Sequence, residues 1–246
     1  MFKFSQDNID RHKLIIITLI LAITMIECTQ TIANKIGNIK GITVTGSSSK
    51  IVTSDSASLS FDISAKANSK NTAYKTISNQ LPQVVDYLIE AGFSKDDIDI
   101  KPQNGYETYK YAPNGVMTNE VSHYNLSQNI TVNSKDVQKI KTLSNDLAKL
   151  IDKGININVY EPQYFYSKLA DDKVVLLKEA SVDAKERASA MLKATNNRVG
   201  KINSVKMGVF QITPVDSNNV SDMGINDTTS IDKKITSVVN VVFEIK

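Results

Sequence analysis

The stretch ASLSFDISA, residues 57–65, alternates apolar side chains with small or polar ones. Such alternation is typical of a β-strand with one buried face, because successive side chains point to opposite sides of a strand. The stretch ITVTG at residues 42–46 has the same pattern. The sequence therefore predicts that two strands open the fold. Ser54 and Asp55, which lie between them, are suited to closing a hairpin.

Three stretches carry apolar residues three or four positions apart, which predicts helices with one buried face. Gly92 and Gly154 follow the first two stretches, where glycine commonly ends a helix. Pro82 lies inside the first stretch and predicts a kink or a restart there, and Ser134 is suited to cap the second. The predicted helices span residues 71–91, 134–151 and 171–195.

The third helix carries alanine at every fourth position, at Ala180, Ala184 and Ala188. These residues form a narrow face that allows close approach to a sheet or another helix. Asp171 and Asp172 lie at its start, where acidic residues favour a helix N-terminus.

Further apolar or alternating stretches predict more strands, with Asn114-Gly115 as a turn between two of them. The fold class that follows is α+β, with three helices packed on a mainly antiparallel sheet. A polar connection at residues 214–230 precedes the last strand. The further predicted strands span residues 98–100, 106–111, 126–132, 155–160, 202–213 and 235–245.

The N-terminal stretch LIIITLILAITMI, residues 14–26, has no charge and follows Lys3, Arg11, His12 and Lys13. It predicts one N-terminal hydrophobic helix. As a helix it would be about 20 Å long, shorter than the roughly 30 Å hydrocarbon layer, which favours an export signal. The small-residue cleavage pattern is poor, so an uncleaved membrane anchor stays open. Both alternatives predict an extracytoplasmic, periplasmic location for the rest of the chain.

The predicted division is a basic flank with the hydrophobic segment at residues 1–26, a polar linker at 27–40 and an α+β domain at 41–246. Cys28 is the single cysteine, so an intramolecular disulfide is excluded and a cysteine-ligated zinc site is not expected. The formal net charge is +3, but only three of the 29 basic residues are arginine. Because lysines alternate with acidic residues, we expect a solvated surface and no nucleic-acid partner.

Three groups of residues together resemble the SIMPL-domain family of bacterial envelope proteins. The resemblance covers residues 41–246 and implies an exported or membrane-anchored α+β domain. Some members are associated with oxidative-stress defence and some are described as self-assembling, and no general catalytic site comes with the family. The residues that carry the resemblance are AKERASAMLKA at 184–194, GKI at 200–202, GVFQITP at 208–214, SIDKKITSVVNVVF at 230–243, the opening strand to Gly46 with Asp55 and Ala57, and the stretch 124–132 leading to Asp136.

The sequence offers no set of residues for catalysis. His123 is the only histidine beyond the hydrophobic segment, so a hydrolytic triad or a histidine metal site would depend on one residue. Neither GxGxxG nor GxxxxGK[ST] occurs. Asp96 with Asp97, like Asp171 with Asp172, fits turns and helix caps. We therefore predict no catalytic residue, no metal ligand and no cofactor.

Tyrosines and aspartates supply the only candidate interaction surface. Three tyrosines near residue 160 share parity and would face one side of a regular strand, although Pro162 disturbs the register. Cross-strand packing of these rings and a solvated 214–230 loop are the alternatives. The candidate surface residues are Tyr160, Tyr164, Tyr166, Asp216, Asp222 and Asp227.

The expected function is that of a non-catalytic extracytoplasmic protein of the cell envelope. We expect a homo-oligomer that self-associates through sheet edges or the 214–230 loop, and a membrane contact through residues 14–26. The family resemblance adds a link with stress defence. The alternative is a periplasmic binding module for a small envelope ligand, whose identity the sequence does not reveal. An enzyme would need a convergent acid and base, which the sequence does not present.

Overall fold

The computed structural model describes residues 16–31 and 41–246. Residues 16–31 are helical, so the predicted N-terminal helix is present and continues through the first residues of the predicted linker. The basic flank, the first two residues of the hydrophobic run and the rest of the linker lie outside the described residues. Within residues 16–31 and 41–246, no helix combines the length and the apolar character needed to cross a membrane.

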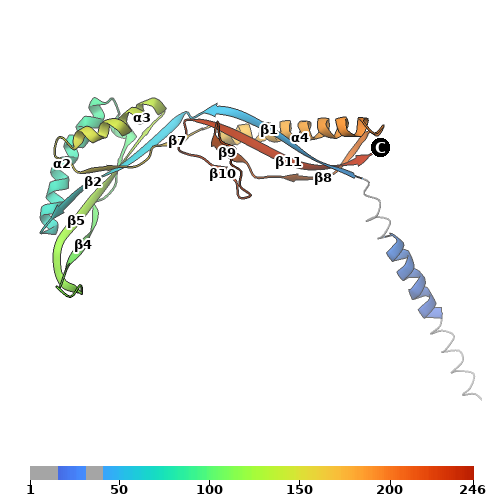
Figure 1. The fold of residues 1–246 in the computed structure, drawn as a ribbon, viewed down its shortest axis with the longest axis horizontal. Coiled ribbons are helices and arrows are strands. Elements are labelled where there is room, and N and C mark those ends of the chain that lie inside the picture. The colour runs from blue at the N-terminus through green and yellow to red at the C-terminus, as the bar shows by residue number, and fades with distance from the viewer. Residues whose placement is uncertain (1–15, 32–40) are drawn as a thin grey trace, which may run out of the picture. The chain divides into compact units, whose positions relative to one another are not determined.

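The chain beyond residue 41 has an α+β fold with two sheets (Figure 1). Its residues group into two compact units. Among the described residues, the first unit comprises those up to Ser47, Ala180–Gly208 and Val238–Lys246, and the second comprises Ser48–Glu179 and Val209–Ser237. The predicted division into segments 1–26, 27–40 and 41–246 stays a prediction.

A six-stranded antiparallel sheet lies in the second unit, with β5 and β2 at its centre. Phe61 of β2 pairs with Ile130 of β5, and the paired residues on either side of them alternate between polar and apolar. This alternation confirms the half-buried strand predicted from residues 57–65. The strands are β2 (Ser56–Ala67), β3 (Ile98–Ile100), β4 (Asn104–Tyr111), β5 (Met117–Ser134), β6 (Ile157–Val159) and β7 (Gln163–Phe165).

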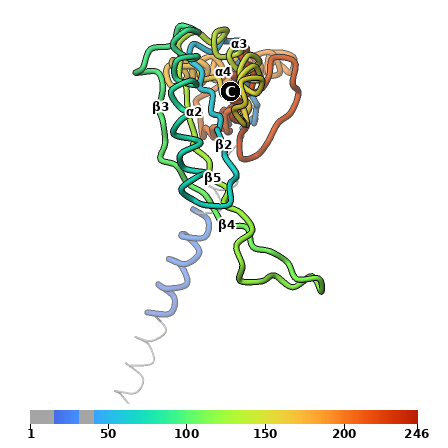
Figure 2. The backbone as a smooth tube through the Cα atoms, turned by 90° about the vertical axis from the view of Figure 1, so that its left-hand side faces the viewer, coloured from blue at the N-terminus to red at the C-terminus, as the bar shows by residue number. Residues whose placement is uncertain are grey.

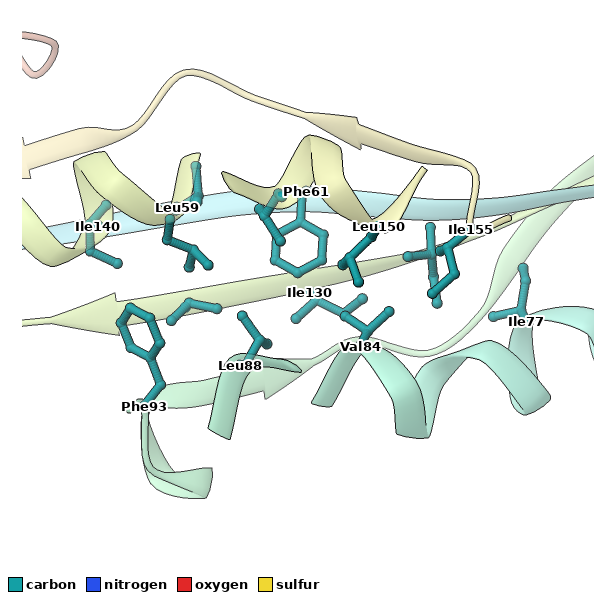
Figure 3. Close-up of a cluster of buried hydrophobic side chains, with 14 of the residues drawn as sticks. Leu59, Phe61, Ile77, Val84, Leu88, Phe93, Ile130, Ile140, Leu150 and Ile155 are labelled. Carbon is teal, nitrogen blue, oxygen red and sulfur yellow. The ribbon is translucent and has the colours of Figure 1, made fainter. Parts of the chain in front are cut away.

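Two helices supply the hydrophobic partners of this sheet, α2 (Lys70–Glu90) and α3 (Val137–Asp146). A 3₁₀ turn at Leu147–Leu150 extends α3. Figure 3 shows the apolar side chains of the central strands pointing toward those of the helices. The fully buried members of this core include Leu59, Phe61, Ile63, Ile77, Val84, Leu88, Ile130, Ile140, Leu147, Leu150 and Ile155. The opposite face of the sheet carries the polar positions of the alternating pattern.

The ends of these helices differ in detail from the prediction. Helix α2 runs through Pro82 as one element, so the predicted restart is not observed. The cap of α3 is Asp136, whose Oδ1 accepts hydrogen bonds from the amides of Gln138 and Lys139, both at 3.0 Å. Ser134 cannot serve as that cap because it is still the last residue of β5 and pairs with Ala57.

The second sheet has five strands, ordered β1-β11-β9-β10, with β8 also paired to β11. The pairs of β11 with β8 and β9 are antiparallel, whereas β9 and β10 are parallel. The strands are β1 (Gly41–Thr53), β8 (Val199–Met207), β9 (Gln211–Pro214), β10 (Ile225–Asn226) and β11 (Asp232–Ile245). The third long helix, α4 (Leu169–Lys193), directly precedes β8 in the sequence.

Close packing of α4 in the first unit depends on small residues. Ala180, Ala184 and Ala188 are fully buried, which agrees with the predicted narrow alanine face. They meet β1 at Gly46, where a Cβ atom would lie 2.1 Å from the Ala180 carbonyl oxygen and 2.5 Å from the Ala184 amide nitrogen. Helix and strand backbones therefore touch at a point that accepts only glycine.

The prediction of three helices on one sheet is only partly correct. The described residues form four α-helices and two sheets, and only α2 and α3 join the core of the six-stranded sheet. The predicted hairpin at Ser54-Asp55 does not form, because β1 pairs with β11 while β2 pairs with β5. The predicted strand 202–213 is also two strands, since β11 changes partner from β8 to β9. Alternation identifies a strand but not its partner.

Candidate functional site

The three candidate tyrosines do not share one face. Tyr164 is the only one of them inside β7, and it is buried in the core of the six-stranded sheet. Tyr160 is 47% exposed and its hydroxyl donates to Asp62 Oδ2 at 2.6 Å. Tyr166 is half-buried and its hydroxyl donates to Asp172 Oδ2 at 2.8 Å. The parity argument fails because the regular strand covers only Gln163–Phe165.

The pKa of each tyrosine reflects this placement. The hydrogen bond to the Asp62 carboxylate raises the pKa of Tyr160, and the bond to Asp172 raises that of Tyr166. Burial is the main cause that raises the pKa of Tyr164. All three phenols are therefore protonated near neutral pH and act as hydrogen-bond donors or packing groups.

The candidate aspartates are also separated. Asp216 and Asp222 are exposed in the loop between β9 and β11, whereas Asp227 is half-buried. The amides of Thr229 and Ser230 donate to Asp227 Oδ1 at 2.8 and 3.3 Å. Burial raises the pKa of Asp227, but these hydrogen bonds outweigh it and the net pKa is lowered. Asp227 thus shapes the turn that returns the chain to β11.

A buried lysine that the sequence analysis missed lies beside Asp227. Lys233 is 3% exposed, and its Nζ donates to the Tyr164 carbonyl oxygen at 2.9 Å and to the Asp227 carbonyl oxygen. Burial lowers the pKa of Lys233, and the negative charge of Asp227 opposes that effect. A signal was present in the sequence, because Lys233 has the same parity in β11 as the buried Ile235 and Val239.

A cavity of about 110 Å³ lies next to this lysine and is lined by Tyr164, Tyr166, Asp227 and Lys233 among others. The structure therefore brings three of the six candidate residues to one place. Lys233 Nζ donates to carbonyl oxygens on both sides of the cavity, one in β7 and one in the turn at Asp227. The two hydrogen bonds of Lys233 connect the turn at Asp227 to β7 and β11.

A second polar network involves Asp172, which the sequence analysis assigned to a helix cap. Its carboxylate instead accepts hydrogen bonds from Lys50 Nζ at 2.7 and 2.9 Å and from the Tyr166 hydroxyl. The bond from Lys50 and then that from Tyr166 lower the pKa of Asp172. Nearby, Asp55 accepts bonds from the Ser167 amide and hydroxyl, which lower its pKa.

We expect Asp172→Asn to lower stability at pH 7, because the ion pair with Lys50 is lost. The folded-state pKa of Asp172 is depressed below its ordinary value of 3.8. Its stabilising contribution is therefore complete above that pH and disappears as the pH falls through the depressed folded-state value. Urea unfolding as a function of pH should show the difference between wild type and variant shrinking below pH 3.8. The exposed neighbour, changed as Asp171→Asn, is the matched control; equal effects of the two variants would contradict the assignment.

The edge strand β8 exposes large apolar side chains in the first unit. Among the strands that the structure describes, β8 pairs only with β11. Ile202, Val205 and Met207 are 58%, 54% and 56% exposed. They pair with Phe243, Val241 and Val239, which are all buried, and directly opposite residues lie on the same face of a sheet. On that face, the side chains of β11 are therefore buried, whereas those of β8 are exposed to solvent.

The loop at residues 214–230 exposes a smaller apolar surface. Gln211 holds it through bonds between its amide side chain and the backbone of Ser221, at 2.7 and 3.3 Å. Val220 and Met223, near its apex, are 81% and 93% exposed. An anchored loop with apolar residues at its tip can serve as a contact surface, but its only strand, β10 (Ile225–Asn226), has two residues, whereas β8 has nine.

The described residues contain no group of three or more histidine, cysteine, aspartate or glutamate side chains that would hold a metal ion. His123 lies in β5 with its Nδ1 3.1 Å from the Ser122 hydroxyl. Comparison with protein families finds one whose model, SIMPL, described as a protein of unknown function (DUF541), matches residues 42–243. No curated protein matches the chain.

Proposed function

Because the chain belongs to the SIMPL family, we propose that it is a non-catalytic, extracytoplasmic module of the cell envelope that self-associates through the open edge of β8. The observation that carries this proposal is the exposure of Ile202, Val205 and Met207 on an edge strand. An edge strand presents unpaired backbone amides and carbonyls, and a second strand of the same kind satisfies them. Apolar side chains on one face then add buried area.

The polar side chains of β8 limit uncontrolled pairing. Lys206 and Ser204 pair with Asn240 and Val242 on the other face of the sheet, and the pairing register shifts between Val242 and Phe243, as at a β-bulge. Lysines and bulges are common protections of an exposed edge. They favour one closed arrangement of copies over an open stack, which is what a discrete homo-oligomer requires.

The location rests on the hydrophobic segment 14–26 and its basic flank, together with the family resemblance. The proposed link with stress defence rests on that resemblance alone. Alkaline phosphatase joined after Lys246 is active only outside the cytoplasm, so an active fusion is the expected result. An inactive but stable fusion would contradict the proposed location. Intact mass of the mature chain distinguishes a cleaved signal from a retained anchor.

We expect Val205→Lys to weaken self-association at least about tenfold, because the new charge would be buried against the partner copy. Light scattering of residues 41–246 over a concentration series measures the effect. Val182→Lys is the matched control, since Val182 is 49% exposed on α4. A wild-type chain that stays monomeric at tens of micromolar would refute the assembly. If Met223→Lys dissociates the oligomer and Val205→Lys does not, the contact is the 214–230 loop.

A further inference from the structure

The polar face of the six-stranded sheet carries a hollow of about 440 Å³ that has no role in the proposed assembly. It is formed by β2, β4, β5 and β6 together with Asn156, on the side opposite the hydrophobic core. The β4–β5 hairpin bends away from the other strands (Figures 1 and 2), and Asn104, Gly105 and Tyr106 of β4 line the hollow. A volume of this size lies within the usual range for small-ligand sites.

Amide side chains dominate the lining of this hollow. Asn104, Asn125, Asn156 and Asn158 line it with the hydroxyls of Ser64 and Ser127, and its only charged residues are Asp62 and Lys66. One acid and one base leave the hollow without net charge. A neutral ligand with many hydroxyl groups matches such a surface, because each amide offers a donor and an acceptor.

Neighbouring side chains hold three of these amides in place. Asn156 Nδ2 donates to the Ser64 hydroxyl at 2.7 Å, and Asn125 Nδ2 donates to the Thr108 hydroxyl at 2.8 Å. The Ser127 hydroxyl donates to Asn104 Oδ1 at 3.1 Å. In the described part of the chain, each contact uses one end of an amide and leaves its other end for a ligand. Pre-oriented groups lose little entropy on binding.

A second hollow of about 290 Å³ adjoins the first and shares Gly105, Tyr106 and Leu126 with it. Tyr109 and Tyr124 also line it, together with Glu107 and with Lys70, the first residue of α2. Tyr106 lies between the two hollows and is 70% exposed, so its ring is free to cover an apolar ligand face. Gly105 permits this arrangement, since a Cβ there would lie 2.2 Å from the Asn125 carbonyl oxygen.

We propose that the first hollow is a groove that binds a neutral oligosaccharide, with the ring of Tyr106 against the face of one sugar unit. Sugars present hydroxyls at their edges and C–H groups on their faces. Fixed amides match the edges, and an exposed tyrosine ring matches the faces. The groove lies on the six-stranded sheet and the assembly edge on β8, so either proposal stands or fails without the other.

The test is titration of the full-length chain with chitotriose, cellotriose and maltotriose, followed by calorimetry and saturation-transfer NMR. We expect at least one trisaccharide to bind with a Kd of about 1 mM or tighter. Tyr106→Ala and Asn156→Ala should each weaken that binding at least about tenfold. Tyr111→Ala is the matched control, because Tyr111 is 68% exposed on the same strand but lines neither hollow.

Several outcomes would overturn the proposal. These are the absence of binding by all three sugars, equal binding of the neutral peptide trialanine, and unchanged affinity of Tyr106→Ala. Equal losses in Tyr106→Ala and Tyr111→Ala would also overturn it. Circular dichroism of every variant shows whether weaker binding comes from the changed residue or from unfolding of the protein. Val205→Lys should bind the sugar as wild type does, which keeps this result independent of self-association.

Discussion

Gly46→Ala is expected to destabilise the first unit by about 3 kcal/mol or more, since the added methyl overlaps the backbone of α4. The Cβ would lie 2.1 Å from the Ala180 carbonyl oxygen, 2.5 Å from the Ala184 amide nitrogen and 2.7 Å from Ala184 Cβ. Two of these atoms belong to the helix backbone and do not move by a simple rotamer change. The helix would have to shift away from β1 and give up contacts along its alanine face.

Urea unfolding followed by circular dichroism measures this loss. The matched control is Thr43→Ala, an exposed position on the same strand, which should change stability by less than about 0.5 kcal/mol. Hydrogen exchange of α4 amides between residues 180 and 193 should accelerate in Gly46→Ala. A variant as stable as wild type would show that helix and strand are not in backbone contact.

Lys233→Met is expected to lower the free energy of unfolding by about 2–4 kcal/mol, because one buried and one partly buried carbonyl oxygen lose their donor. Methionine has a similar length, so the change removes the charge and the hydrogen bonds with little loss of volume. The oxygens of Tyr164 and Asp227 would remain in a site from which water is largely excluded. Asp227 would also lose the nearby positive charge that helps to hold its pKa down.

The neighbouring lysine is the control for this variant. Lys234 is half-buried on the other face of β11, and its Nζ donates to the Ser217 carbonyl oxygen at 3.0 Å. Lys234→Met should lower the free energy of unfolding by no more than about 1 kcal/mol, since the Ser217 carbonyl oxygen can accept a hydrogen bond from water instead. Thermal unfolding of both variants measures the difference. If the two lose equal stability, the buried ammonium does not hold the turn at Asp227.

Some features of the site were accessible to sequence reasoning. The polar alternation in β2 and β5 predicts a polar sheet face, and the residues that these two strands place in the groove follow from it. The inward parity of Lys233 in β11 also indicates a buried lysine. Parity did not place Tyr160, Tyr164 and Tyr166 on one face, because parity applies only inside a regular strand and β7 is three residues long.

The sequence by itself determined the α+β class, the three long helices beyond residue 41, most of the strands and the family, because periodicity and local propensity act over a few residues. Only the tertiary structure decided that β1 and β2 enter different sheets, that β11 exchanges β8 for β9, and that amides from three separate segments meet in one groove. Strand pairing and side-chain convergence depend on contacts between residues far apart in the chain, and no local pattern records them.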